Sequence, residues 1–250
     1  RAMSDCKSSK KEEIRQRIWR LLEEKRVALP PKPIYGRIPN FMGAERAALK
    51  LSQQPVFAKA KVIKVNPDSP QREVRRLALL YGKLLIMPTP RLRRGFIFLD
   101  PAKVRDIDFA STIKGAFMLG RIVGLKELKE IVKKVDLIVA GSVAVTPYGA
   151  RVGKGGGYSE MEYAVLREME LVDEKTPIVT TVHDLQLVDE LPFENHDIPI
   201  DVVVTPTRIL ETHTNLPRPP GVIWSKVTAK MLDEISVLKE LQQLGREKAR

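Results

Sequence analysis

The stretch Asp136-Leu-Ile-Val-Ala-Gly-Ser-Val-Ala-Val145, followed through Pro147-Tyr-Gly149 by Arg151-Val-Gly-Lys-Gly-Gly-Gly-Tyr158, decides the fold class. Its first part has the strongest buried-strand pattern in the chain, and a helical pattern begins at Ser159 directly after the glycines. A strand, a glycine-rich loop and a helix in this order are typical of phosphate-binding turns in α/β proteins. The stretch therefore predicts an α/β fold with an anion site.

Four of the fifteen glycines lie between Gly153 and Gly157. Glycine permits positive φ angles and close backbone approach, so such a run can turn its N–H groups toward one phosphate. The helix after it would add free N–H groups and its positive dipole end, and Arg151 and Lys154 would add full charges. A flexible surface turn is the alternative. The spacing matches neither a Walker loop nor a standard dinucleotide fingerprint.

Strand-like and helical patterns alternate along most of the chain, which favours parallel βαβ units. The predicted strands cover residues 56–65, 83–88, 95–100, 136–145, 177–183, 202–206 and 221–224. The predicted helices run from 10 to before Pro30 and over 44–52, then from 69 onward, 125–135, 159–169 and 228–247. A stripe of Leu232, Ile235, Leu238 and Leu241 in the last helix is expected to pack into the core.

Length and composition bound the class of protein. The 250 residues can form one domain, which we expect over residues 10–250 behind a disordered polar tail over 1–9. A formal net charge of +12 favours polyanionic partners such as nucleotides, RNA or acidic surfaces. The single Cys6 excludes an intrachain disulfide, and no apolar run reaches about 20 residues. We expect a cytoplasmic protein with no membrane partner; the oligomeric state is left open.

Two further basic motifs each allow two interpretations. Lys11 and Arg15 lie one helical turn apart, so they can grip a phosphate together or form a solvated basic face. Arg91, Arg93 and Arg94 follow a predicted strand, where they can face an anion or belong to a solvated loop.

Several segments in the same order resemble the 5-formyltetrahydrofolate cyclo-ligase family, also called methenyltetrahydrofolate synthetases. These are the glycine loop, Leu187–Pro192, His196–Asp201 and Val204–Pro206, and Lys11-x-x-x-Arg15 resembles the family's ATP-contacting helix. Within the family the chain is most similar to the methenyltetrahydrofolate synthetase domain-containing branch. That similarity rests on residues 38–41, 88–93, 141–145, 182–184 and 205–208, and the resemblance covers roughly residues 10–245.

The resemblance implies a three-layer αβα sandwich with a largely parallel sheet, as in CoA transferase-like folds. It implies an ATP- and Mg²⁺-dependent ligase of folate one-carbon metabolism that phosphorylates the formyl oxygen of 5-formyltetrahydrofolate. Ring closure then gives 5,10-methenyltetrahydrofolate, ADP and phosphate. The implied nucleotide-binding residues are Lys11, Arg15, Gly153, Gly155, Gly156, Gly157 and Tyr158. The other implied roles are catalysis by Lys154 and Arg151, a metal ligand at Glu160, and a substrate cleft at His196 and Asp197.

Two departures from the family pattern bear on the chemistry. The family follows its glycine loop with Tyr-Tyr-Asp, whereas this chain has Tyr158-Ser159-Glu160. The family's Trp-Gly-Ile-Pro-Glu-Pro segment has no counterpart between Ser111 and Leu128. Nucleotide binding is thus better supported than the folate reaction. The alternatives are a nucleotide- or anion-binding regulatory or RNA-binding protein without cyclo-ligase activity, or an enzyme for another phosphorylated or folate-like molecule. For His196 and Asp197 the alternative is a pair that holds a turn.

Overall fold

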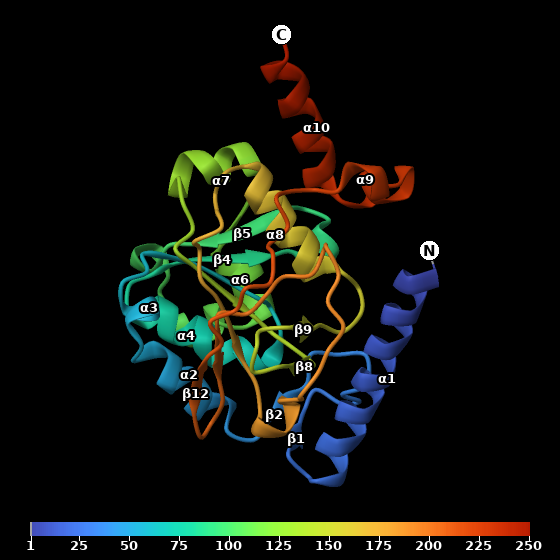
Figure 1. The fold of residues 1–250 in the computed structure, drawn as a ribbon. Coiled ribbons are helices and arrows are strands. Elements are labelled where there is room, and N and C mark those ends of the chain that lie inside the picture. The colour runs from blue at the N-terminus through green and yellow to red at the C-terminus, as the bar shows by residue number, and fades with distance from the viewer. Residues whose placement is uncertain (1) are drawn as a thin grey trace.

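One eight-stranded mixed sheet organises the protein in a computed structural model that describes residues 2–250 (Figure 1). In spatial order the strands are β12 (Ile209–Glu211), β11 (Val202–Val204), β10 (Ile178–Thr181), β7 (Leu137–Ala140), β3 (Val62–Val65), β4 (Leu84–Pro88), β5 (Phe96–Leu99) and β6 (Arg121–Val123). The five strands from β11 to β4 are mutually parallel, whereas β12, β5 and β6 are antiparallel to their neighbours. The largely parallel sheet is therefore confirmed.

Helices cover both faces of this sheet. The first face packs α2 (Ala44–Ser52), α3 (Pro55–Ala58), α4 (Arg72–Leu80), α5 (Ile107–Ala110) and α6 (Ile113–Leu119). The second packs α7 (Leu125–Val132), α8 (Tyr158–Glu168) and α10 (Ser236–Lys248). The layers are visible in Figure 1, where α2 and α4 lie opposite α7 and α8. The predicted αβα sandwich is confirmed.

Strand β7 illustrates why the sequence folds in this way. Leu137 and Val139 pack into the core on the α2/α4 face, while Ile138 and Ala140 pack into the core under α8. A strand buried on both faces needs an uninterrupted apolar run, since successive side chains point to opposite sides. Each fully buried aliphatic side chain of the larger kind contributes about 1.5–3 kcal/mol.

Shorter elements decorate the sandwich. The paired strands are β1 (Ala28–Leu29) with β2 (Asn40–Phe41) and β8 (Ala144–Val145) with β9 (Arg151–Val152). The 3₁₀ turns are η1 (Ser69–Gln71), η2 (Pro90–Leu92), η3 (Pro101–Lys103), η4 (Asp184–Gln186) and η5 (Trp224–Lys226), and the remaining helix is α9 (Ala229–Glu234). No helix within residues 2–250 is long and apolar enough to cross a membrane.

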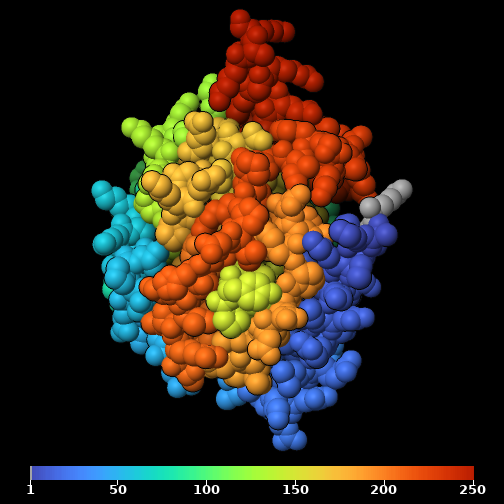
Figure 2. Space-filling view, viewed as in Figure 1, coloured from blue at the N-terminus to red at the C-terminus, as the bar shows by residue number. Residues whose placement is uncertain are grey.

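Helix α1 (Ala2–Glu24) begins earlier than expected. The tail predicted to be disordered over residues 1–9 is helical from Ala2, and residue 1 lies outside the described residues. Lys7 Nζ donates to the Phe193 carbonyl at 3.0 Å, and Ser4 Oγ donates to Glu194 at 3.2 Å. Figure 2 shows α1, in blue, lying along the orange segment that contains these acceptors. Contacts distant in sequence thus hold turns that the local polarity did not predict.

Two predicted strands have different ends. Residues 136–145 do not form one strand: β7 ends at Ala140, and Val143 N–H bonds the Val152 carbonyl, so the chain continues as the β8/β9 hairpin. Residues 56–65 also divide, because Pro55 opens the short helix α3 before β3 begins at Val62.

The C-terminal region also departs from the prediction. Residues 221–224 form no strand, because Val222 N–H bonds the Glu168 carboxylate instead of a sheet neighbour. The predicted helix over 228–247 is interrupted at Ile235, whose φ of −108° and ψ of 96° separate α9 from α10. The predicted stripe is largely confirmed: Ile235, Leu238 and Leu241 are buried in the core under α8, and Leu232 packs against it.

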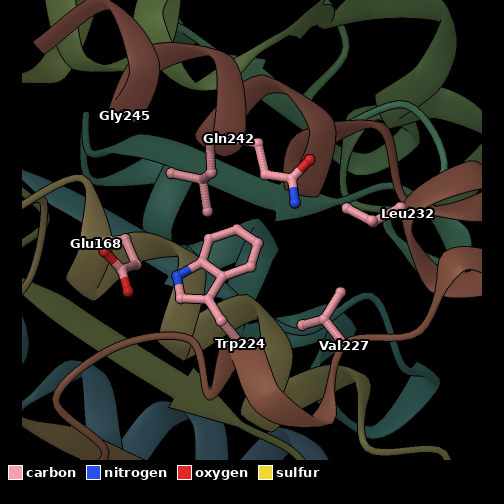
Figure 3. A pocket seen from close by; sticks show the side chains of 7 residues that line it. Glu168, Trp224, Val227, Leu232, Gln242 and Gly245 are labelled. Atoms are coloured by element: carbon pink, nitrogen blue, oxygen red, sulfur yellow. The ribbon is translucent and has the colours of Figure 1, made fainter. Parts of the chain in front are cut away.

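A small pocket of about 360 Å³ lies where this region meets α8 (Figure 3). Glu168 comes from the last turn of α8, and Trp224 forms the floor in this view, opposite Gln242 of α10. The far end of α10 projects from the body of the molecule (Figure 1). The pocket is therefore a joint between the C-terminal helices and the α8 layer.

Candidate functional site

A cleft of about 760 Å³ lies beyond the carboxyl ends of β3 and β4, beside α1. Ligands of open α/β sheets bind at this end of the strands. All the site residues predicted from the sequence line it: Lys11, Arg15, Arg151, Gly153, Lys154, Gly155, Gly156, Gly157, Tyr158, Glu160, His196 and Asp197. The structure thus brings together residues from three distant segments of the chain.

The glycine loop, residues 153–157, connects β9 to α8. Gly155 has a φ of +109° and Gly157 a φ of +73°, conformations that residues with a Cβ rarely adopt. Within the described chain, the N–H groups of residues 153–160 have no hydrogen-bond acceptor, and the N-cap Gly157 provides no side chain. A row of unused N–H groups at a helix N-terminus can accept an anion.

Arg15 connects helix α1 to this loop. Its Nε donates to the Gly153 carbonyl at 2.7 Å, and its Nη1 lies 3.0 Å from a carboxylate oxygen of Glu12. The side chains of Lys11 and Arg15 are only 7% and 12% exposed. The interpretation of these two residues as a solvated basic face is therefore wrong, whereas Lys154 is exposed at the cleft.

Arg151 has a different position from the one expected of a free phosphate ligand. Its side chain is 1% exposed, its Nε donates to the Gly141 carbonyl at 3.0 Å, and its Nη1 lies 3.1 Å from Glu160 Oε1. Both contacts are within the protein, so in this conformation Arg151 joins β9 to the end of β7 and orients Glu160. Sequence spacing could not show this, because it depends on the β8/β9 hairpin.

Lys11 lies at the centre of a group of charges on the opposite side of the loop. Its Nζ is 2.7 Å from Glu194 Oε2 and 2.7 Å from Asp197 Oδ2, and His196 Nε2 lies 3.5 Å from Asp197 Oδ1. Asp197 Oδ2 also accepts the Glu194 N–H at 2.8 Å. Asp197 therefore both lines the cleft and holds a turn, which combines the two interpretations of this motif.

The electrostatic balance at Glu194 favours its charged form. Burial works to raise the pKa of Glu194, but the hydrogen bond and charge of Lys11 outweigh it, aided by His196 and Ser4, so the pKa lies below its usual value. The Lys11 ammonium thus holds α1 on this turn as long as the carboxylate stays ionised.

Two places offer oxygen ligands to a cation. Glu160 lines the cleft in the first turn of α8, 15% exposed, with one oxygen directed at Arg151. Mg²⁺ needs only one or two protein carboxylates when phosphates supply the rest, so the donor set at Glu160 fits. Glu194, His196 and Asp197 also present ligand atoms within 4.8 Å of one another, but the Lys11 ammonium already neutralises both carboxylates.

The sequence did not identify several groups that line the same cleft. Asn66, Asp68 and Glu162 are among them, and Lys64 lies behind Glu162 as its ion-pair partner. The available signal was a lysine inside the apolar strand pattern of Val62–Val65. Charge in a strand buried on both faces requires a partner, and that partner could not be located without the fold.

The wall farther from the glycine loop is partly apolar. Ile38, Pro90 and Ile113 line it, and the Ile113 side chain is left 43% exposed although it is large and aliphatic. Arg91 lines the cleft as well, whereas Arg93 and Arg94 are exposed residues outside it. Both interpretations of the arginine motif therefore hold, each for different residues. The cleft combines an anion-binding end with a surface for a flat apolar group.

Comparisons with known proteins agree with this arrangement. The model of the 5-formyltetrahydrofolate cyclo-ligase family matches residues 7–206. The methenyltetrahydrofolate synthase domain-containing protein of Mus musculus is 45% identical over 239 residues, covering 93% of this chain and 63% of the relative. The protein of the same description from Homo sapiens is 40% identical over 247 residues, covering 95% and 63%. The chain therefore spans less than two thirds of the length of these relatives.

Among solved structures, the 5,10-methenyltetrahydrofolate synthetase of Aquifex aeolicus has a TM-score of 0.51. The match covers 83% of this chain and 95% of that chain, at 21% sequence identity. At this level of identity the likeness supports the fold and not the chemistry.

Proposed function

The chain belongs to the 5-formyltetrahydrofolate cyclo-ligase family, and from this premise we propose that it binds ATP at the glycine loop and drives the cyclisation of 5-formyltetrahydrofolate. The products are 5,10-methenyltetrahydrofolate, ADP and phosphate. The observation that carries the proposal is the row of N–H groups over residues 153–160, without an acceptor in the described chain, at the mouth of the cleft.

The nucleotide phosphates fit this end of the cleft for electrostatic reasons. Phosphoryl transfer needs positioning and charge neutralisation more than covalent catalysis. The loop N–H groups and the N-terminus of α8 supply fixed partial charges. Lys154 adds a full charge at the surface of the cleft, and Arg15 holds α1 against Gly153. We propose Lys154 as the group that contacts the transferred phosphoryl, with Gly156 and Tyr158 shaping the loop.

Arg151 and Glu160 form a second functional unit in this proposal. Glu160 would hold Mg²⁺, which would neutralise phosphate charge when bound. Arg151 positions the Glu160 carboxylate at 3.1 Å and keeps it in the first turn of α8. Replacement of the family's aspartate by glutamate lengthens the side chain by one methylene, and the Arg151 contact restrains that extra freedom.

The substrate would occupy the rest of the cleft. The apolar surface of Ile38, Pro90 and Ile113 suits the flat rings of a folate. Ile113 belongs to α6, so this helix lies where the family's missing central segment would contribute. His196 and Asp197 lie at the α1 side and would contact polar groups of the substrate.

Turnover is the direct test. Purified protein is mixed with ATP, Mg²⁺ and 5-formyltetrahydrofolate, and the absorbance of the methenyl product is followed. The expected result is formation of product that requires ATP and falls strongly in Lys154→Met. Folded protein that binds ATP but forms no product would instead support the anion-binding alternative without cyclo-ligase activity.

A further inference from the structure

A buried ion pair lies at the floor of the cleft and has no role in the function proposed above. Lys64 of β3 pairs with Glu162 of α8, and their side chains are only 3% and 6% exposed. Lys64 Nζ also donates to Asn66 Oδ1 at 3.0 Å, and Asn66 Nδ2 donates to Ser159 Oγ at 3.2 Å. These contacts form a polar chain from α8 to the end of β3.

The position of Lys64 in the sheet is unfavourable for packing. Ile63 and Val65 face the α2/α4 core, whereas Val62 packs into the core under α8. The two-residue period of a strand therefore places Lys64 on the α8 side, at the edge of an apolar layer. Burying two charges costs more desolvation than a close-packed apolar pair would, so the ion pair gives no clear gain in stability. A functional reason for it is the more economical explanation.

Glu162, and not Lys64, is the member of the pair that lines the cleft. It is one helical turn beyond Tyr158, and residues spaced by four in a helix have Cβ atoms about 5–6 Å apart. The N–H groups of residues 158–160 lie in that first turn. A ligand whose phosphate is held there would bring its reacting centre close to the Glu162 carboxylate.

The surroundings of Glu162 make it more basic than a carboxylate in water. Burial raises the pKa of Glu162, Asp68 and Glu160 add to that rise, and the charge and hydrogen bond of Lys64 oppose it. The other charged groups on neighbouring elements are Arg151, which binds Glu160, and Arg91 of η2 across the cleft. Lys64 is therefore the contact that keeps this buried carboxylate ionised.

We propose that Glu162 is the general base that accepts the proton of the nitrogen that closes the ring, with Lys64 as its positioning residue. This proposal rests on the cyclo-ligase function proposed above. In the step concerned, the substrate N10 bonds to the carbon of the phosphorylated formyl group. The bond from that carbon to the phosphate oxygen breaks, phosphate leaves with the electron pair, and the N10 proton passes to a Glu162 oxygen.

A carboxylate is a sufficient base for this step. The attacking nitrogen gains positive charge as its new bond forms, so its proton becomes acidic and a weak base can remove it. General bases of this kind contribute roughly 10²- to 10⁴-fold to a rate. The base must be ionised when the substrate is bound, which is the role of Lys64.

The test compares pH profiles of kcat for Glu162→Gln and Lys64→Met, with the exposed Glu130→Gln of α7 as the control. Glu162→Gln should lower kcat by roughly 10²- to 10⁴-fold at every pH. Lys64→Met should shift the acidic limb of the profile to higher pH and regain activity as pH rises, because the unpaired carboxylate then ionises later. Wild-type profiles in both variants would overturn the proposal.

Further variants separate the base from a merely structural pair. Glu162→Asp keeps a carboxylate, so it should retain more activity than Glu162→Gln; equal losses would count against a base. If a single replacement prevents folding, the neutral pair Lys64→Met with Glu162→Gln removes both charges together. That double variant should fold, bind ATP and remain inactive at all pH values, and wild-type turnover in it would refute the base. Wild-type protein that forms no methenyl product would instead remove the underlying function.

Discussion

Replacing Gly157 by alanine tests the glycine loop with a matched control elsewhere in the chain. Gly157 has a φ of +73° and Gly82 a φ of +77°, and at neither position would an added Cβ meet an atom within 4 Å. Gly157 lines the cleft, whereas Gly82 follows α4 outside it. The two substitutions therefore impose the same backbone strain with no steric overlap, and only one of them lies in the proposed site.

The expected magnitude follows from that strain alone. An alanine held in the left-handed region costs about 1–2 kcal/mol, so Gly157→Ala and Gly82→Ala should lose similar amounts of unfolding free energy. If the free loop leaves this conformation in Gly157→Ala, ATP must restore it on binding. That cost corresponds to an ATP dissociation constant raised roughly 5- to 30-fold, against no change in Gly82→Ala.

The assay combines urea unfolding with ATP titration by calorimetry on both variants. Equal destabilisation with a weaker affinity in Gly157→Ala alone would support phosphate binding at the loop. An unchanged ATP affinity in Gly157→Ala, with both variants destabilised alike, would refute the assignment of the loop.

Three other predictions concern the elements around the cleft. Lys11→Met leaves the Glu194 and Asp197 carboxylates without their common partner and should cost about 3–5 kcal/mol in urea unfolding; a loss below about 1 kcal/mol would contradict a buried pair. The pKa of Glu194 lies below its usual value, so its contribution to stability is present above about pH 4.5 and is lost as pH falls through the lower folded value. Acid unfolding followed by circular dichroism should show this loss in the wild type and not in Lys11→Met. In Gly221→Ala the new Cβ would lie 2.5 Å from Glu168 Oε1, which should break the Val222 contact and lower the midpoint of thermal unfolding; an unchanged midpoint would show that the joint is flexible.

The sequence predicted the architecture well where local patterns decide it. Five strands of the parallel sheet lie within predicted segments, and α2 has the predicted bounds over 44–52. The prediction was wrong where distant contacts decide. The first turns of α1 are held by Phe193 and Glu194, and Val222 is held by Glu168, so their own residues did not reveal the structure.

The site was predictable as a set of residues but not as a set of contacts. The glycine run and the resemblance identified residues that do line one cleft. They did not show that Arg151 is turned toward Gly141, or that Lys11 is bound by Glu194 and Asp197. Those orientations depend on side chains from separate segments, and so does the partnership of Lys64 with Glu162.

The central claim is that ATP cleavage at the glycine loop drives ring closure of a formylated folate. The measurement that tests it most directly is the simultaneous quantification of ADP, phosphate and the methenyl product during turnover of 5-formyltetrahydrofolate. The account predicts one ADP and one phosphate for each methenyl group formed, and none of the three when ATP is left out. ADP released without methenyl product, or methenyl product formed without ATP, would contradict it.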